Sequence, residues 1–245
     1  MLGLSSSLVK GGTTGRAYVR DGLKLYMPYK GANIWKGTQF VGTGSTSFDG
    51  GDDYIEVSAD SSINRNSLTK LTIIAWMKPD TIGENSYGRI VDKRTETGDT
   101  TDDGLGYSFH IGADNALTGV VAGNSENAVG RSATSAFSLK VWSHVAMTFN
   151  EDGDNKVKLY HNGVKLTLAT DDDFEGSSVD DSGITLRIGN LGDDTTRTFD
   201  GSLKNVAIWN RALTATEIQN VMYKTYEEVS GRLGDSTLVA WWSLD

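Results

Sequence analysis

The feature that most constrains the fold is a series of short apolar segments, each followed by a cluster of turn-forming residues. Val, Ile, Leu and aromatic residues dominate these segments, which is typical of β-strands, and none continues into a long helical pattern. Strands spaced evenly, without helices between them, predict an antiparallel sandwich or jelly roll and argue against a parallel βαβ fold. The predicted strands cover residues 54–57, 71–77, 107–111, 117–121, 144–149, 157–161, 164–168, 184–188, 203–209 and 238–244.

Two local motifs define a hairpin and a helix. Asn162-Gly163 separates two alternating segments, and both residues tolerate the positive φ of a type I′ turn. Thr214 and Glu217 have the spacing of a capping box, which predicts a helix that begins at Thr214. The apolar positions that support this helix are Leu213, Ile218, Val221, Met222 and Tyr226. The sequence therefore predicts an all-β, two-sheet antiparallel jelly-roll sandwich with one short C-terminal α-helix.

The chain of 245 residues is expected to form one domain that follows an N-terminal arm. Residues 1–20 are rich in Gly, Ser and Thr without a period, which is typical of a flexible or docking arm, or of a disordered tail. Residues 21–245 are assigned to the jelly-roll domain. Its first strand is predicted at residues 21–28, where Leu23, Leu25 and Met27 share one face.

Composition excludes several classes of function. A formal net charge of −9, without a visible basic patch, opposes binding to nucleic acid or to anionic membrane surfaces. No segment approaches the roughly 20 apolar residues of a membrane span, and the N-terminus lacks the pattern of a secretory signal. The absence of Cys excludes disulfides, thiolate nucleophiles and Cys-based metal centres.

Seven segments, taken in order, resemble the laminin-G-like jelly-roll family, a branch of the concanavalin A-like lectins and glucanases. They are residues 47–57, 71–79, 89–93, 142–149, 159–164, 186–189 and 199–214. The resemblance implies two stacked antiparallel sheets and a helix near the C-terminus. Residues 1–28 also resemble the start of structural proteins from marine tailed phages.

One segment departs from the family pattern. Residues 238–245 resemble the strand that normally opens such a domain and would duplicate the strand predicted near the N-terminus. We favour the interpretation that this segment closes the sheet beside the first strand. The alternative is that it begins a second unit.

The carboxylate pattern argues against catalysis. Glycan-cleaving relatives use two or three carboxylates at alternate positions of one strand, and retaining chemistry needs a separation of about 5 to 5.5 Å. The chain has no Glu-x-Asp-x-Glu or Glu-x-Asp-x-x-Glu pattern, and residues 151–154 are expected to form a hairpin turn instead. His110, His144 and His161 lie in predicted strands and are expected to be structural, because no serine triad or nucleophile elbow accompanies them.

Ca²⁺ in a structural role is the cofactor that the sequence favours. Asp49 and Asp200 each follow a Phe and precede a Gly, and they would approach each other if the first and last family strands pair. Asp52 and Asp53 would then complete a set of hard oxygen ligands. Asp-Gly turn chemistry accounts for the same residues equally well.

Aromatic side chains in candidate loops are the expected sugar contacts, because lectins of this class stack a pyranose on an aromatic face. Trp35, Tyr87 and Tyr107 are the candidates.

Three functions follow in order of preference. The first is a non-catalytic surface or structural protein at the virion surface, a decoration or fibre component that forms a homo-oligomer with capsid or other virion proteins. The alternative is an extracellular, calcium-dependent lectin module that binds surface polysaccharide. A glycoside hydrolase is disfavoured.

Overall fold

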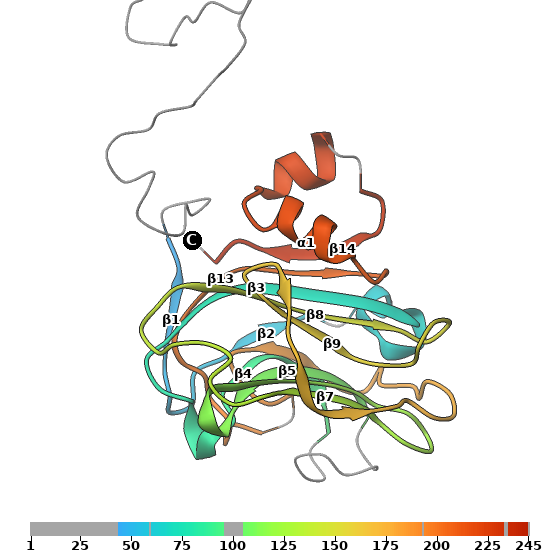
Figure 1. Ribbon diagram of the computed structural model, residues 1–245, viewed down its shortest axis with the longest axis horizontal. Coiled ribbons are helices and arrows are strands. Elements are labelled where there is room, and N and C mark those ends of the chain that lie inside the picture. The colour runs from blue at the N-terminus through green and yellow to red at the C-terminus, as the bar shows by residue number, and fades with distance from the viewer. Residues whose placement is uncertain (1–43, 59, 96–104, 193, 233–234, 245) are drawn as a thin grey trace, which may run out of the picture. The chain divides into compact units, whose positions relative to one another are not determined.

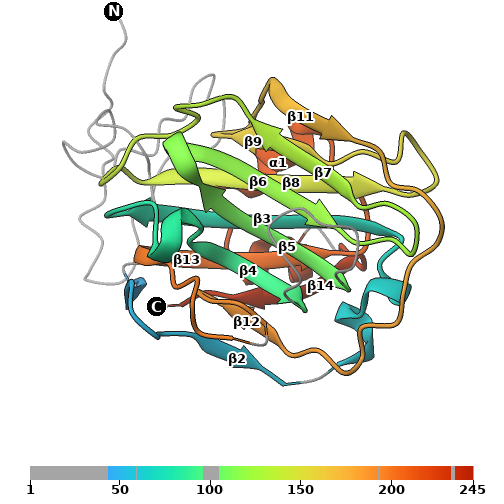
Figure 2. The same ribbon diagram turned by 90° about the horizontal axis from the view of Figure 1, so that it is seen from below.

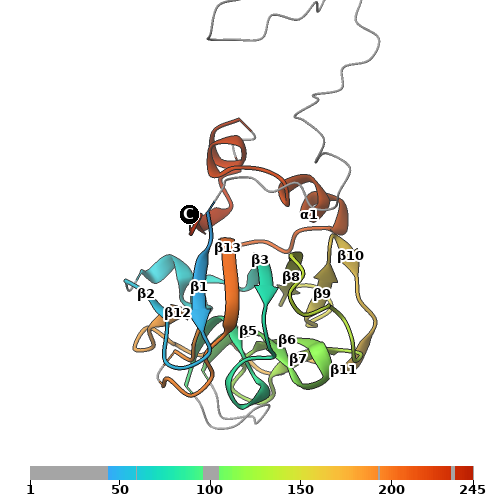
Figure 3. The same cartoon turned by 90° about the vertical axis from the view of Figure 1, so that its left-hand side faces the viewer.

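Two antiparallel sheets are stacked face to face in the protein, which is described here by a computed structural model (Figures 1 and 3). The structure describes residues 44–58, 60–95, 105–192, 194–232 and 235–244. The first sheet has the order β1 (Thr46–Asp49), β13 (Asp200–Trp209), β3 (Lys70–Pro79), β8 (Ser143–Asn150), β9 (Lys158–His161) and β10 (Val164–Lys165), and β14 (Leu238–Trp242) also pairs with β13. The second has the order β11 (Leu168–Asp172), β7 (Ala128–Ser132), β6 (Ala116–Val121), β5 (Gly106–Gly112), β4 (Arg89–Arg94), β12 (Leu186–Ile188) and β2 (Ile55–Val57).

The helices are few and short. They are the 3₁₀ turns η1 (Ser61–Ile63), η2 (Arg65–Ser67), η3 (Glu84–Ser86) and η4 (Ala113–Asn115), the helix α1 (Ala215–Val221) and the π-helical turn η5 (Glu228–Arg232). The predicted all-β sandwich with one short α-helix near the C-terminus is therefore confirmed. Within the described residues, no helix combines the length and apolarity that a membrane crossing requires.

The main core lies between the two sheets and is built by alternation. On β5, Tyr107, Phe109 and Ile111 point into this core, so Ser108 and His110 point to the outer face of the second sheet. Strand β3 instead reads as a continuous apolar run, because both of its faces are covered: residues such as Ile73 join the main core, whereas residues such as Ile74 join a second cluster.

The second cluster joins α1 to the outer side of the first sheet (Figure 3). Thr214 caps the helix together with Glu217, which confirms the predicted capping box. The indole of Trp76 donates to the carbonyl of Met222 at 2.8 Å, and this bond anchors the helix end to β3. The helix ends at Val221, so Tyr226 lies beyond it.

Strand β14 closes the first sheet by pairing with β13. It pairs with residues 206–209, while β1 pairs with residues 200–203, so the two short strands share one edge of β13. Residues 238–242 therefore belong to the first sheet, as the favoured interpretation expected, whereas their predicted place beside the first strand stays a prediction. The predicted strand at residues 21–28, the arm at residues 1–20 and Trp35 lie outside the described residues.

Several details differ from the sequence prediction, and among them β1 and β4 were not in the set of predicted strands. Residues 164–168 form parts of two strands, because the chain leaves the first sheet after β10 and enters the second at β11. Strand β7 was not predicted, because its central Gly130 and Arg131 interrupt the apolar pattern. The predicted hairpin is confirmed, since Asn162 and Gly163 have φ values of 50° and 75°.

Candidate functional site

The two Phe-Asp-Gly turns lie side by side at one end of the sandwich. Strand β1 pairs with β13 so that Asp49 and Asp200 are register partners, as the sequence predicted. Gly50 has φ of 77°, and a Cβ at this position would lie 2.9 Å from the Cβ of Asp200. Glycine is therefore required where the two turns meet.

Three carboxylates converge in the first of these turns. Asp49, Asp52 and Asp53 are exposed, and each offers an oxygen within 4.8 Å of the others; we call this group the acidic turn. Asp49 Oδ1 accepts from the amide of Gly51 at 2.8 Å, and Asp53 Oδ2 accepts from the amide of Asp49 at 3.0 Å. The acidic turn suits Ca²⁺ in ligand type, since exposed carboxylates, carbonyls and water are what this cation binds. Asp200 lies beside the acidic turn but outside it, because its Oδ2 accepts from Thr81 Oγ1 at 2.7 Å.

The loop after β12 links the acidic turn to the start of β4. The hydroxyl of Thr198 donates to the carbonyl of Gly51 at 2.8 Å. The residue before Thr198 is Arg197, and its carbonyl oxygen accepts a hydrogen bond from the amide of Arg89 at 3.0 Å. Three loops that are distant in sequence are thus hydrogen-bonded into one surface.

Two tyrosines on this surface are accompanied by arginines. Tyr87 is half-buried, with the guanidinium carbon of Arg197 4.5 Å from its ring centre and the ring of His110 at 6.2 Å. Tyr54 is 41% exposed and directly follows the acidic turn, and the guanidinium carbon of Arg187 lies 4.1 Å from its ring centre. The sequence prediction included Tyr87 and missed Tyr54, although the position of Tyr54 immediately after Asp52-Asp53 could have indicated it.

Tyr107 is not a sugar contact, and that prediction is wrong. It lies within β5 and is fully buried, and its hydroxyl donates to the carbonyl of Ile63 at 2.8 Å. Burial raises the pKa of Tyr107 well above its usual range. A ring that faces the main core cannot stack on a sugar, so this residue is structural.

Strands β4, β5, β6 and β7 lie side by side in the second sheet (Figure 2). Charged and polar residues that face away from the main core form a line across these four strands. Arg89 on β4 is in register with His110 on β5, His110 with Thr118 on β6, and Thr118 with Arg131 on β7. We call these four residues the arginine row. Neighbouring strands lie about 4.8 Å apart, so the row crosses about 14 Å of the sheet.

Positive charge dominates the arginine row. Burial, and then the charges of four arginines, hold the pKa of His110 well below its usual range, so its imidazole is neutral at pH 7. Asp92 is fully buried beside Arg89, with 3.1 Å between its Oδ2 and Arg89 Nε. Burial raises the pKa of Asp92, while Arg89 and Arg94 oppose the shift.

The other residues considered for catalysis have structural contacts. Glu151 pairs with Arg65 at 2.7 Å in the turn between β8 and β9, which agrees with the predicted hairpin. His144 is fully buried and lies edge-on to Trp76. His161 Nε2 lies 3.0 Å from Ser143 Oγ, a pair that the sequence prediction missed, but Ser143 is only 2% exposed. A substrate cannot reach that hydroxyl.

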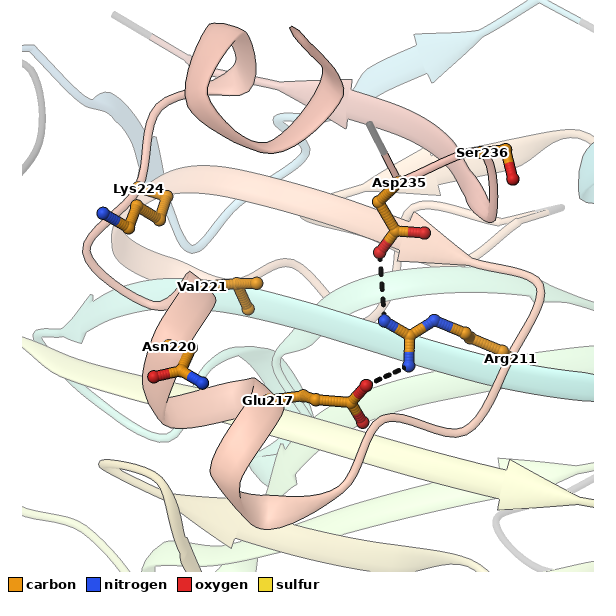
Figure 4. Close-up of a pocket in the computed structure, with 7 residues that line it drawn as sticks. All are labelled: Arg211, Glu217, Asn220, Val221, Lys224, Asp235 and Ser236. Atoms are coloured by element: carbon orange, nitrogen blue, oxygen red, sulfur yellow. Dashed lines mark hydrogen bonds and ion pairs between the residues drawn. The ribbon is translucent and has the colours of Figure 1, made fainter. Parts of the chain in front are cut away.

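A pocket of about 600 Å³ lies between α1 and the segment that precedes β14 (Figure 4). Arg211 crosses it and pairs with Glu217 at 2.6 Å and with Asp235 at 3.1 Å. Its guanidinium is thereby matched by two carboxylates, so the cluster ties the helix to β14 rather than offering an open charge.

Comparisons with known proteins agree with this architecture. Three solved structures share the fold: a Bacteroides ovatus protein to which carbohydrate binding has been ascribed (20% identity, TM-score 0.55, 83% of this chain and 52% of that one); the native heptameric SAP-like pentraxin of Limulus polyphemus (18%, 0.50, 72% and 80%); and the CBM40 of the Ruminococcus gnavus IT-sialidase bound to alpha2,3 sialyllactose (15%, 0.55, 74% and 97%).

The chain spans about half the length of the Bacteroides ovatus protein, and at these identities the likeness concerns the fold alone. No curated protein sequence matches the chain. The family model described as the concanavalin A-like lectin/glucanases superfamily (Laminin_G_3) matches residues 49–219, which is more than half of the sequence. The chain therefore belongs to the concanavalin A-like lectin/glucanase superfamily, in its laminin-G-like branch.

Proposed function

We propose that this chain is a non-catalytic glycan-binding module. The observation that carries the proposal is the surface formed by the three linked loops, where Tyr54 and Tyr87 each stack with an arginine next to the acidic turn. Sugar sites combine an aromatic face, which packs on the apolar side of a pyranose, with charged groups that bond its hydroxyls. The fold shared with two proteins named for carbohydrate recognition supports the same function.

Ca²⁺ bound in the acidic turn would stabilise this surface. Three carboxylates in one exposed turn repel each other, and a divalent cation would remove that repulsion and fix the loop. The cation would also supply open coordination positions for sugar hydroxyls.

A glycan array probed with the full chain in calcium-containing buffer tests the proposal. We expect binding to at least one glycan class, weakened about five- to tenfold by Tyr87→Ala or Tyr54→Ala, because a stacking contact contributes about 1 kcal/mol. Tyr226→Ala is the matched control, since Tyr226 is 50% exposed and lies beyond α1. An empty array, or equal losses for all three variants, would contradict the proposal.

Placement on a virion surface, with capsid proteins or other copies of the chain as partners, stays a prediction from the sequence. The arm at residues 1–20 that motivated it lies outside the described residues. Mass spectrometry of purified virions checks the location, and light scattering of the isolated chain checks the oligomer. The heptameric Limulus pentraxin makes the second measurement worthwhile.

A further inference from the structure

The outer face of the first sheet is covered only in part by α1. On β3, alternate residues point to this face, and they pass from covered to open towards the end of the strand. Ile74 packs in the second cluster together with the helix, and Trp76 is 1% exposed against the ring of Tyr223, whose centre lies 5.7 Å from its own. Lys78, the next residue on this face, is only half-buried. The face therefore opens where β3 approaches its end.

Four side chains form a row across this open part of the sheet. Ser47 on β1 is in register with Ser202 on β13, and Ser202 is in register with Lys78 on β3. The row continues to Trp142, which directly precedes β8, because Lys78 Nζ lies 6.0 Å from the centre of its ring. Ser47 is exposed and the other three are half-buried. We call these four residues the open strip; neighbouring strands lie about 4.8 Å apart, so it crosses about 14 Å of the sheet.

The backbone before Trp142 is fixed at the end of β3. Lys140 has φ of 61°, which is unfavourable for a residue with a side chain, and its amide donates to the carbonyl of Pro79 at 2.6 Å. Leu139 and Val141, on either side of Lys140, are 36% and 53% exposed. The open strip thus ends on an apolar surface that is positioned in advance, and a surface of this kind binds a ligand at a lower entropic cost.

The remainder of the open strip offers hydrogen-bonding groups of both kinds. The hydroxyls of Ser47 and Ser202 can donate and accept, and the ammonium of Lys78 donates. Asp49 and Asp200 occupy the next outward positions of β1 and β13, and their carboxylates accept. One ammonium beside two carboxylates leaves no excess of positive charge, so the strip does not favour an anion. Sugar hydroxyls, which both donate and accept, match this surface.

We propose that the open strip binds a neutral oligosaccharide of several sugar units. This inference rests on the glycan-binding function proposed above and adds a second surface to it, because Trp142 adjoins the first sheet, whereas Tyr54 and Tyr87 precede strands of the second. One pyranose packs on the indole of Trp142, and the units that follow extend past Lys78 to Ser47. The strip is longer than one sugar ring, so it selects chains over monosaccharides.

Binding of neutral oligosaccharides to the full chain tests this inference. The probes are the disaccharides and hexasaccharides of glucose, mannose and galactose, and titration calorimetry measures each Kd. We expect at least one hexasaccharide to bind about tenfold more tightly than its disaccharide, because only the longer chain reaches from Trp142 to Ser47 and gains the hydrogen bonds along the strip.

Variants assign the binding to the open strip. Trp142→Ala should weaken the hexasaccharide about tenfold, and Lys78→Gln should weaken it about fivefold, whereas Trp142→Phe keeps a ring and should lose less. Lys70→Gln is the matched control for charge, because Lys70 lies at the opposite end of β3 and its side chain is 39% exposed. Tyr226→Ala is again the control for an exposed aromatic ring. Melting curves identify any variant that fails to fold, and Lys78→Gln carries the test if Trp142→Ala does not fold.

The outcomes separate the two proposals. Hexasaccharide binding that is unchanged in folded Trp142→Ala or Lys78→Gln, or equal Kd values for disaccharides and hexasaccharides, would overturn the open-strip inference. Glycan-array binding that Tyr54→Ala or Tyr87→Ala weakens, without binding of any hexasaccharide, would overturn it and leave the glycan-binding function standing. Absence of binding to every oligosaccharide and to the glycan array would end both.

Discussion

Replacing Tyr107 by Phe tests whether this tyrosine is a core residue or a ligand contact. The change removes one oxygen and keeps the ring, so the packing of the main core is preserved. The carbonyl of Ile63, a residue that is 3% exposed, loses the donor that lies at 2.8 Å. A buried acceptor left without its partner costs about 1 to 3 kcal/mol.

The expected loss of stability is large enough to measure. For a domain of about 200 residues, about 2 kcal/mol lowers the Tm by about 4 to 8 °C. Calorimetry or fluorescence melting measures this shift, and urea unfolding gives the free energy of unfolding independently. Glycan binding by Tyr107→Phe, measured well below its Tm, should equal that of the unchanged protein, because the ring of Tyr107 faces the core.

Tyr223→Phe is the matched control, because Tyr223 is 44% exposed and such surface changes alter stability by about 0.5 kcal/mol or less. Equal melting temperatures for both variants would show that the Tyr107 hydroxyl does not contribute to the stability of the fold. A loss of glycan binding by Tyr107→Phe with unchanged stability would refute the assignment of Tyr107 to the core.

Three further predictions concern pH, backbone conformation and metal. Burial lowers the pKa of His144 to about 3, whereas an unfolded chain has about 6.5, so stability should fall as pH drops from 6.5 towards 3, by up to about 1.4 kcal/mol per pH unit. His144→Gln should make the fall of Tm with pH shallower, and parallel curves would contradict this. Gly189→Ala should lower the free energy of unfolding in urea by about 3 kcal/mol, because φ of Gly189 is 92° and a Cβ there would lie 2.1 Å from the Phe48 ring. Gly183→Ala is the control and should leave the stability unchanged, because a Cβ there would have no atom within 4 Å. Ca²⁺ at about 100 times its Kd should stabilise the protein by about 2.7 kcal/mol, and this gain should disappear on addition of a chelator or in Asp52→Asn. A Tm that changes neither with the chelator nor in the variant would exclude the site.

The strands, the hairpin and the helix cap were predictable because each depends on residues close together in sequence. Asn162-Gly163 requires only its own positive φ values, and Thr214 with Glu217 requires only one helical turn. The approach of Asp49 to Asp200 was predictable as well, once the pairing of the strands that precede and follow them was assumed. The continuous apolar pattern of residues 71–77, by contrast, is typical of a strand buried on both faces but does not indicate that a helix covers one of them.

The tertiary structure decided which side chains meet and which are buried. Whether Tyr87 and Tyr107 face solvent depends on strand bounds and loop paths, and a tyrosine near the start of a strand cannot be distinguished by sequence from one in a loop. The arginine row arises from the register of four strands, and each of its members appears isolated in the sequence. Sequence by itself determined the local elements and the family, because propensity and pattern act over a few residues. The approach of Asp200 to the acidic turn and the arginine row exist only after strands distant in sequence have paired, since side chains become neighbours through that pairing.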